Sequence, residues 1–223
     1  MSIYYQDDLV TLYHGDCLEH PEWWTGADVL VTDPPYGIGY QGFGGRKGEP
    51  RRTEGRISIA GDDTTGVRDA ALHAWGNRPA LIFGTWRAER PRDARTLLIW
   101  DKGLVGMGAL DLPWGPSHEE IYVLGTGFVG KRGKSVLHIH GLASNDPERF
   151  GHPTPKPVPL MEALIEKCPP GVIADPFAGS GSTLVAAKLL GRKAVGVELE
   201  EKYCEIAARR LSQGVLDFGE VSE

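Results

Sequence analysis

Short apolar runs alternate along this chain with segments whose apolar residues recur at helical spacing. The runs predict strands at residues 9–13, 28–32, 80–83, 96–100, 120–124, 172–174 and 194–197. The other segments predict helices at residues 67–75, 158–168, 182–190 and 201–211. Strands that alternate with helices predict an α/β fold with a doubly wound, mostly parallel sheet covered on both faces.

Two regions contain neither an apolar run typical of a strand nor apolar residues at helical spacing. Residues 37–56 contain seven glycines, and we expect a mobile loop there, because a long irregular segment in a compact domain is typically functional or disordered. Residues 126–154 form the second irregular region, apart from a run at 136–139 that suits a strand. The length of 223 residues suits a single domain, so residues 1–223 are interpreted as one unit.

Composition excludes several classes of protein. No stretch reaches about 18 consecutive apolar residues, so no membrane span is predicted. The N-terminal residues lack a basic flank and an apolar signal core, which predicts a cytoplasmic protein. The three cysteines (Cys17, Cys168 and Cys204) form no CxxC pair, so neither a metal site nor a disulfide framework is predicted.

The formal net charge of −6 disfavours nucleic-acid binding if bulk charge alone is considered. Local charge changes this picture, because basic side chains cluster in the two irregular regions. The first cluster is Arg46, Lys47, Arg51, Arg52 and Arg56, and the second is Lys131, Arg132 and Lys134. Contact with DNA phosphates and solvated loop charge are both open interpretations of these clusters.

A glycine-rich turn follows the predicted strand at residues 172–174. It comprises Asp175, Pro176, Phe177, Ala178, Gly179, Ser180 and Gly181, and a predicted helix begins at Ser182. Glycines let the backbone approach a ligand closely, and a helix start offers free N–H groups. No Lys follows Gly181, which disfavours a triphosphate. Glu198 lies about 20 residues beyond the turn, where a carboxylate holds ribose hydroxyls in dinucleotide folds. These features predict a nucleoside cofactor site; the alternative is an ordinary strand–helix turn with a surface glutamate.

The sequence Asp33-Pro34-Pro35-Tyr36 follows the predicted strand at residues 28–32. Two successive prolines stiffen the segment and leave its carbonyls free to accept hydrogen bonds. The Asp33 carboxylate and the Pro34 carbonyl can hold the two hydrogens of an aromatic amine out of the ring plane, which aims the nitrogen lone pair at an electrophile. Tyr36 can hold the base by stacking. The segment therefore predicts a site for an exocyclic amine; the alternative is a rigid turn that caps a strand.

With these motifs the chain resembles the S-adenosylmethionine-dependent amino-methyltransferases of DNA. Residues 33–36 match the catalytic motif of that family, and residues 175–183 match its cofactor motif closely. Residues 152–157, His-Pro-Thr-Pro-Lys-Pro, match the signature that precedes the cofactor motif in one arrangement. The catalytic motif precedes the cofactor motif, which corresponds to the β-type order.

The resemblance implies a role for each matching residue. The catalytic residues would be Asp33, Pro34, Pro35 and Tyr36, which handle the target base. The cofactor-binding residues would be Asp16, Thr154, Lys156, Asp175, Phe177, Gly179, Ser180, Gly181 and Glu198. Among them, Glu198 would bind the ribose hydroxyls, Asp16 the adenine amine, and Thr154 and Lys156 the methionine end of the cofactor. No metal is implied.

The resemblance also implies a fold and a reaction. The fold would be the Rossmann-like, seven-stranded sheet of the class I methyltransferases, with residues 126–154 as a short target-recognition insertion. The reaction would be methyl transfer from S-adenosylmethionine to the N6 amine of adenine in double-stranded DNA, as in restriction–modification systems, because Asp at the first motif position leans toward adenine in the family. A homodimer is compatible with the sequence.

Four other functions are alternatives to methylation of adenine. A cytosine C5-methyltransferase needs a thiolate nucleophile, and none of the three cysteines follows a proline or lies near Asp33, which excludes that class. An N4-cytosine DNA methyltransferase stays open, because the same motif can hold either amine. Methylation of RNA or of a glutamine side chain ranks third, since those enzymes usually carry Asn in place of Asp33. A non-catalytic module that binds the cofactor or DNA is the alternative from another class.

Overall fold

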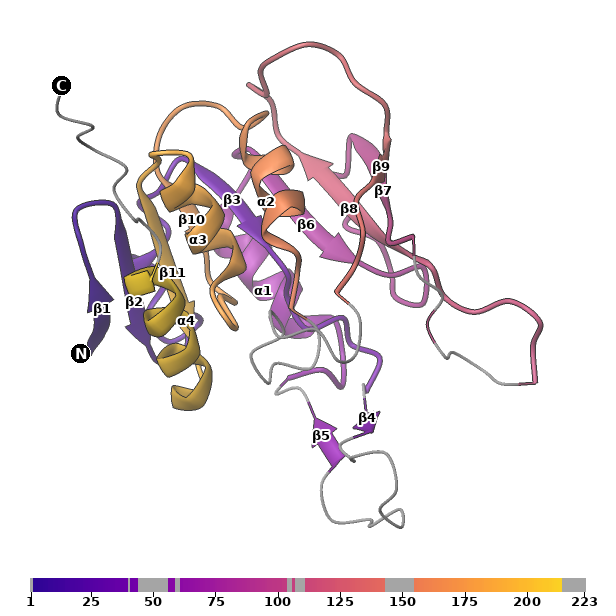
Figure 1. Ribbon diagram of the computed structural model, residues 1–223, viewed down its shortest axis with the longest axis horizontal. Helices are drawn as coiled ribbons and strands as arrows, with labels where there is room; N and C mark the ends of the chain where they lie inside the picture. The colour runs from indigo at the N-terminus through magenta and orange to yellow at the C-terminus, as the bar shows by residue number, and fades with distance from the viewer. Residues whose placement is uncertain are drawn as a thin grey trace, which may run out of the picture.

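The computed structural model describes residues 2–39, 41–43, 56–58, 61–103, 106, 111–142 and 155–213. Within these residues, nine strands form the main sheet, in the order β1-β2-β11-β10-β3-β6-β8-β7-β9 (Figure 1). The strands are β1 Ile3–Gln6, β2 Val10–His14, β3 Val29–Thr32, β6 Ala80–Gly84, β7 Thr96–Asp101, β8 His118–Leu124, β9 Val136–His138, β10 Ile173–Asp175 and β11 Ala194–Glu198.

The five strands β2, β11, β10, β3 and β6 pair with one another in parallel. β8 is antiparallel to both of its neighbours, β6 and β7. This arrangement confirms the predicted mostly parallel sheet. The sheet has nine strands instead of the predicted seven, because one further strand pairs on each side of the predicted ones. β1 forms an antiparallel hairpin with β2, and β9 pairs in parallel with β7.

Two apolar cores cover the two faces of the sheet. Successive strand residues point to opposite faces, so Val29 and Val31 of β3 enter one core and Leu30 enters the other. The first core lies under α2 Val158–Ile165, α3 Ser182–Leu189 and α4 Glu201–Gln213, which lie together over one face in Figure 1. The second core contains Ala71 and Trp75 of α1 Gly66–Trp75 and the buried Trp24, which follows a short 3₁₀ turn, Pro21–Trp23. The predicted double covering is therefore confirmed.

The helices agree with the predicted ones, except that α2 ends at Ile165 instead of residue 168. The physical reason is Pro169-Pro170, because the residue before a proline is disfavoured in helical geometry. The backbone accordingly tightens there: the N–H of Cys168 donates to the carbonyl of Ile165, 3.0 Å away.

Part of the region predicted as an irregular loop forms a two-stranded ribbon. β4 Gln41–Phe43 pairs antiparallel with β5 Arg56–Ser58, with Gly42 opposite Ile57. The ribbon lies beyond the carboxyl ends of the parallel strands of the main sheet (Figure 1). Residues 44–55 between the two strands lie outside the described residues.

None of the helices in the described part of the chain is long and apolar enough to cross a membrane.

Candidate active site

Four carboxylates lie at the ends of four neighbouring strands. Asp16 follows β2, Glu198 ends β11, Asp175 ends β10, and Asp33 follows β3. These strands are adjacent in the order β2-β11-β10-β3 and run in parallel, so all four residues lie at the carboxyl ends of the strands, which form one edge of the sheet. This carboxyl edge is where ligands bind in open α/β sheets. The sheet therefore brings the two sequence motifs together.

The two motifs are in direct contact through a buried hydrogen bond. The hydroxyl of Thr32, the residue before Asp33, donates to Oδ1 of Asp175 over 2.6 Å. The N–H of Phe177 donates to the same oxygen at 3.2 Å, and Thr183 contributes a further side-chain hydrogen bond. Burial nevertheless raises the pKa of Asp175 to about 6. Asp175 thus anchors the turn through the N–H of Phe177.

The glycine-rich turn is bonded to Glu198. Gly179 has a φ of 50°, and its N–H donates to Oε2 of Glu198 over 2.7 Å. Oε1 of Glu198 accepts the N–H of Glu200 at 2.8 Å. Each carboxylate oxygen keeps a second lone pair, so the group can still accept from hydroxyl donors. The fixed carboxylate with its remaining acceptor capacity fits a nucleoside with free ribose hydroxyls.

Two other residues of the turn contact α4. Gly181 has a φ of 80°, and a Cβ there would lie 2.8 Å from Cβ of Ala207. Ser180 is buried, and Arg210 donates to its carbonyl at 2.6 Å and to its Oγ at 3.2 Å. The structure therefore places the Ser180 side chain against Arg210. Its described contacts hold the turn onto α4.

The remaining predicted cofactor residues have different surroundings. Phe177 is half-buried against the core that lies under α1. Asp16 accepts the N–H of Leu18 at Oδ1 over 2.8 Å. Thr154 lies outside the described residues, as does His152 of the signature at residues 152–157.

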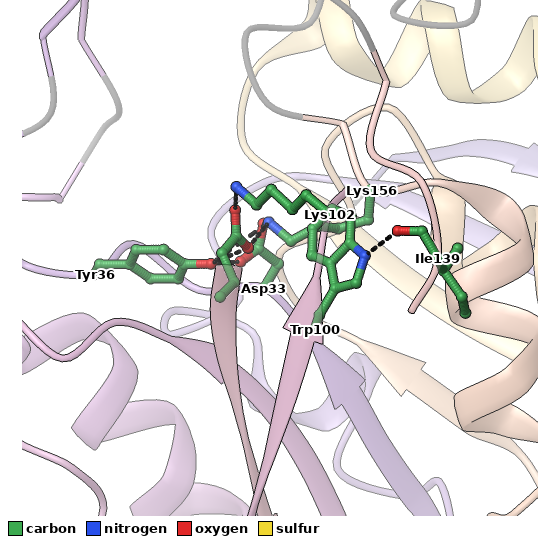
Figure 2. Close-up of polar contacts among 7 residues, drawn as sticks. Asp33, Tyr36, Trp100, Lys102, Ile139 and Lys156 are labelled. Atoms are coloured by element: carbon green, nitrogen blue, oxygen red, sulfur yellow. Dashed lines mark hydrogen bonds and ion pairs between the residues drawn. The ribbon is translucent and has the colours of Figure 1, made fainter. Parts of the chain in front are cut away.

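Asp33 is held by two side chains (Figure 2). The hydroxyl of Tyr36 donates to Oδ1 of Asp33 over 2.7 Å, and the ammonium of Lys156 forms an ion pair with Oδ2. Pro34 is buried and Pro35 is half-buried between them in the sequence. The Asp33 side chain is 25% exposed, which leaves room for a ligand atom to approach its remaining lone pairs.

Lys156 contacts Asp33 in the structure, and its place at the methionine end of the cofactor stays a prediction. Its side chain is 7% exposed, and Nζ lies 3.1 Å from Oε2 of Glu119 in addition to its ion pair with Asp33. The described contacts therefore give Lys156 two carboxylate partners within the protein. The physical reason is that an ammonium this deeply buried needs a nearby negative charge.

Glu119 joins the same network from β8. Oε2 lies 3.1 Å from the hydroxyl of Tyr36, whose one proton Glu119 shares with Asp33, and Oε1 lies 2.5 Å from Nζ of Lys102. The Lys102 ammonium in turn lies 5.2 Å from the ring centre of Trp100, whose indole N–H donates to the carbonyl of Ile139 over 2.7 Å (Figure 2). Two carboxylates and two ammonium groups thus balance one another.

The network shifts the pKa of each of its buried acids. Burial raises the pKa of Asp33; Lys156 lowers it and Glu119 raises it further. Burial also opposes ionisation of Glu119, but Lys156 and Lys102 together lower its pKa to about 2. Burial lowers the pKa of Lys156, but the two carboxylates outweigh it and the net shift is upward. At neutral pH, Glu119 is therefore a fixed negative charge beside Asp33.

Sequence reasoning assigned no role to Glu119, Lys102 or Asp62. Oδ1 of Asp62 accepts the N–H of Gly37 at 2.7 Å, and its carbonyl accepts the N–H of Gly39 at 2.7 Å, which anchors the chain after Tyr36. The one available signal for Glu119 was a carboxylate directly before the predicted strand at residues 120–124. Asp62 gave no signal, because its partner lies 25 residues away across an irregular region.

The second basic cluster lies away from this edge. Because β8 runs antiparallel to β6, the segment after Leu124 leaves from the opposite edge of the sheet, as Figure 1 shows. There the N–H of Val129 donates to the carbonyl of Lys167 over 2.9 Å. The cluster Lys131, Arg132 and Lys134 follows at that edge, which favours the interpretation as solvated charge. Of the first cluster, Arg46, Lys47, Arg51 and Arg52 lie outside the described residues, and only the backbone of Arg56 is described.

No group of three or more His, Cys, Asp or Glu residues in the described ranges is arranged to hold a metal ion.

Comparisons with known proteins agree with this geometry. A family model described as DNA methylase matches residues 84–209, more than half of the chain. The chain is 31% identical to the protein YubD of Escherichia coli K12 over 207 residues, which cover 89% of this chain and 88% of YubD. It is 24% identical to the type II methyltransferase M2.MboI of Moraxella bovis over 240 residues, which cover 92% of this chain and 88% of M2.MboI.

Solved structures show the same fold at low sequence identity. The complex of M1.HpyAVI with S-adenosylmethionine has a TM-score of 0.64 at 20% identity, covering 91% of this chain and 99% of that one. The cytosine-N4-specific PvuII DNA methyltransferase has a TM-score of 0.68 at 16% identity, covering 93% of this chain and 88% of that one. Together with the family match, the motifs and the shared edge of the sheet, these likenesses lead to one conclusion. The chain belongs to the DNA methylase family whose members transfer methyl groups to exocyclic amines, the N6-adenine and N4-cytosine amino-methyltransferases.

Proposed function

We propose that this protein methylates the N6 amine of adenine in double-stranded DNA, with S-adenosylmethionine as the methyl donor. The observation that carries the proposal is that residues 33–36 and the glycine-rich turn follow hydrogen-bonded neighbouring strands, β3 and β10. A base held at the first segment and a nucleoside held at the second would meet at one edge of the sheet. Asp33 supports adenine over cytosine, because Asp at this position leans toward adenine in the family that the sequence resembles.

The donor site consists of residues at the ends of β2, β10 and β11. Glu198 would hold the ribose hydroxyls, Asp16 the adenine amine, and the backbone around Gly179 the remainder of the nucleoside. When bound, S-adenosylmethionine supplies an electrophilic methyl group, whose transfer leaves a neutral thioether and places a positive charge on the accepting nitrogen. The fixed orientation of Glu198, held by two backbone N–H groups, supports this assignment.

The acceptor site consists of Asp33, the Pro34 carbonyl and Tyr36. Asp33 and the carbonyl would accept the two amine hydrogens and turn the nitrogen lone pair out of the ring plane, a positioning effect that accounts for much of such catalysis. The proton that the methylated nitrogen releases would pass to the Asp33 carboxylate. A quarter of the Asp33 side chain is exposed, so the proton can then leave to solvent.

The target base must leave the DNA stack to reach this site. In a duplex, the amine is engaged in pairing and cannot be held from both sides by Asp33 and the Pro34 carbonyl. Extrusion of a base costs a few kcal/mol, least where pairing is already weak. The half-buried Tyr36 lies beside Asp33, where its ring can stack on an extruded base.

The proposal is tested by incubating the protein with unmethylated genomic DNA and S-adenosylmethionine, followed by mass spectrometry of the nucleosides and sequencing with modified-base detection. We expect N6-methyladenine in one sequence context. N4-methylcytosine alone would overturn the adenine assignment, and donor binding with no modified base would leave a non-catalytic module.

Asp33→Ala is the matching variant. It should lose more than a hundredfold in rate, roughly 3 kcal/mol, because a hydrogen bond made by a charged group at the reacting centre is removed. Its affinity for the donor, measured by calorimetry, should stay close to that of the parent. Asp93→Ala, at an exposed loop position, is the control and should keep full activity.

A further inference from the structure

Glu119 is the point at which the charged groups around Asp33 meet. Its Oε2 lies 3.1 Å from both the Tyr36 hydroxyl and the Lys156 ammonium, and its Oε1 lies 2.5 Å from the Lys102 ammonium. Its side chain is 16% exposed, so these three contacts are largely shielded from water. The two groups that bind Asp33 are thus the same two groups that bind Oε2 of Glu119.

This arrangement has a geometric consequence. Lys156 and Tyr36 both reach Asp33 through rotatable side chains, and either could turn away without changing the backbone. Glu119 contacts both of them as well, while Lys102 holds Glu119 itself. With both partners fixed, the Asp33 carboxylate is held in one orientation, and its side chain stays 25% exposed.

We propose that Glu119 is a positioning residue for methyl transfer, which holds Lys156 and Tyr36 against Asp33 so that the carboxylate meets the target amine in one orientation. The inference rests on the proposed function, since it assigns Glu119 to the same site. Glu119 acts through Lys156 and Tyr36 and touches neither base nor donor. Its loss should therefore change the rate of transfer and leave the binding of the donor unchanged.

The structure offers a matched control on the same strand. Glu120 follows Glu119 in β8, and alternation along a strand points it to the other face. Glu120 is also buried and also paired: it forms an ion pair with Arg90 and accepts from the Tyr122 hydroxyl at 2.6 Å. A loss of stability from removing a buried carboxylate in β8 should therefore appear in Glu120→Gln as well, whereas a loss of positioning should not.

The charges that face Asp33 predict a signature in the pH dependence. They are Lys156, which precedes α2; Glu119 in β8, with Lys102 behind it; Tyr36 in the same turn; and Asp175 at the end of β10. Glu119→Gln removes a negative neighbour, so Asp33 ionises more easily and the acid limb of the rate profile should move to lower pH. Lys156→Met removes the positive neighbour, so the acid limb should move to higher pH. A purely structural role would not produce shifts in opposite directions.

The experiment measures single-turnover methylation of unmethylated genomic DNA across pH, donor affinity by calorimetry, and thermal unfolding. For Glu119→Gln we expect a rate about tenfold to a hundredfold lower at neutral pH, since misplacement at a reacting centre can cost this much. We also expect parental donor affinity and an acid limb at lower pH. Glu120→Gln should keep both the rate and the profile of the parent.

A parental rate and profile in Glu119→Gln would overturn the inference while the parent still methylates DNA. Absence of methylation by the parent would instead overturn the proposed function. If Glu119→Gln does not fold, Lys102→Met takes its place, because this partner of Glu119 is 27% exposed and easier to replace. A lower rate with parental donor affinity in Lys102→Met supports the inference, and a parental rate overturns it.

Discussion

The Thr32 hydroxyl donates a 2.6 Å hydrogen bond to Oδ1 of Asp175, across 143 residues of sequence. Thr32 ends β3, directly before the segment proposed to hold the base, and Asp175 ends β10, directly before the turn proposed to hold the donor. Both residues are buried, so water cannot replace the bond. The two halves of the site are therefore linked beneath the ligands.

Replacing Thr32 by Val tests this link. Val has the shape of Thr but lacks the hydroxyl, so Asp175 loses a donor while the packing stays similar. Asp175 keeps its hydrogen bonds from Phe177 and Thr183, so the variant loses one buried hydrogen bond to a carboxylate. We expect the free energy of unfolding to fall by about 1.5–3 kcal/mol in urea titrations. Thr32→Ser keeps the hydroxyl and should lose less. Equal stability of Thr32→Val and the parent would contradict the link.

Replacing Asp175 by Asn should change how stability depends on pH. Burial raises the pKa of Asp175 in the folded protein to about 6, above its value in the unfolded chain. The folded state therefore binds this proton more tightly, and the contribution of Asp175 to stability is lost as pH rises from about 4 to about 6. A shift of about two units corresponds to about 3 kcal/mol at most.

The measurement for this prediction is chemical unfolding of the parent and of Asp175→Asn at about pH 3.5 and about pH 7, below and above the transition. The parent should become less stable relative to the Asn variant at the higher pH. A difference between the two proteins that does not change with pH would show that folding does not raise the pKa of Asp175.

Two glycines allow a matched test of the donor turn. Gly181 and Gly191 both have positive φ, but a Cβ at Gly181 would lie 2.8 Å from Cβ of Ala207, whereas a Cβ at Gly191 would meet nothing within 4 Å. Gly191→Ala should therefore cost only backbone strain, about 1 kcal/mol. Gly181→Ala adds a clash with α4 and should cost about 2–4 kcal/mol.

Donor affinity separates the two glycine variants further. Because Gly181 ends the turn directly before α3, a clash with α4 should move the turn and weaken binding of S-adenosylmethionine in calorimetry. Gly191→Ala should bind like the parent. Parental affinity in a folded Gly181→Ala variant would remove Gly181 from the donor site.

The two basic clusters predict different effects of salt on DNA binding. Contacts with phosphates release counterions, so removing them flattens the dependence of affinity on salt. Replacing the first cluster, Arg46, Lys47, Arg51, Arg52 and Arg56, with Ala should flatten the slope, because this segment follows the base site in sequence. Replacing Lys131, Arg132 and Lys134, at the opposite edge of the sheet, should leave the slope unchanged. The reverse result would place the DNA surface at that other edge.

The sequence by itself determined the elements of the sheet and the identity of both motifs. Apolar runs such as residues 28–32 are long enough to mark buried strands, and helical periodicity such as that of residues 158–168 marks a covering helix. The motifs are contiguous, so their residues stay together in any fold. Local pattern was sufficient for these features because each depends on neighbours within a few residues. It was not sufficient for β1 and the β4–β5 ribbon, whose strands are only three or four residues long and form by pairing with another strand.

Only the tertiary structure decided which distant charges meet. Lys156 lies 123 residues from Asp33 in sequence and forms an ion pair with it, because α2 leads into a strand beside β3. Glu119 reaches the same site because β8 runs opposite to its neighbours and because its register turns Glu119, and not Glu120, toward Asp33. A shift of one residue along that strand would exchange the two carboxylates. Strand order, direction and register are set by packing of the whole sheet, and no local pattern in the sequence encodes them.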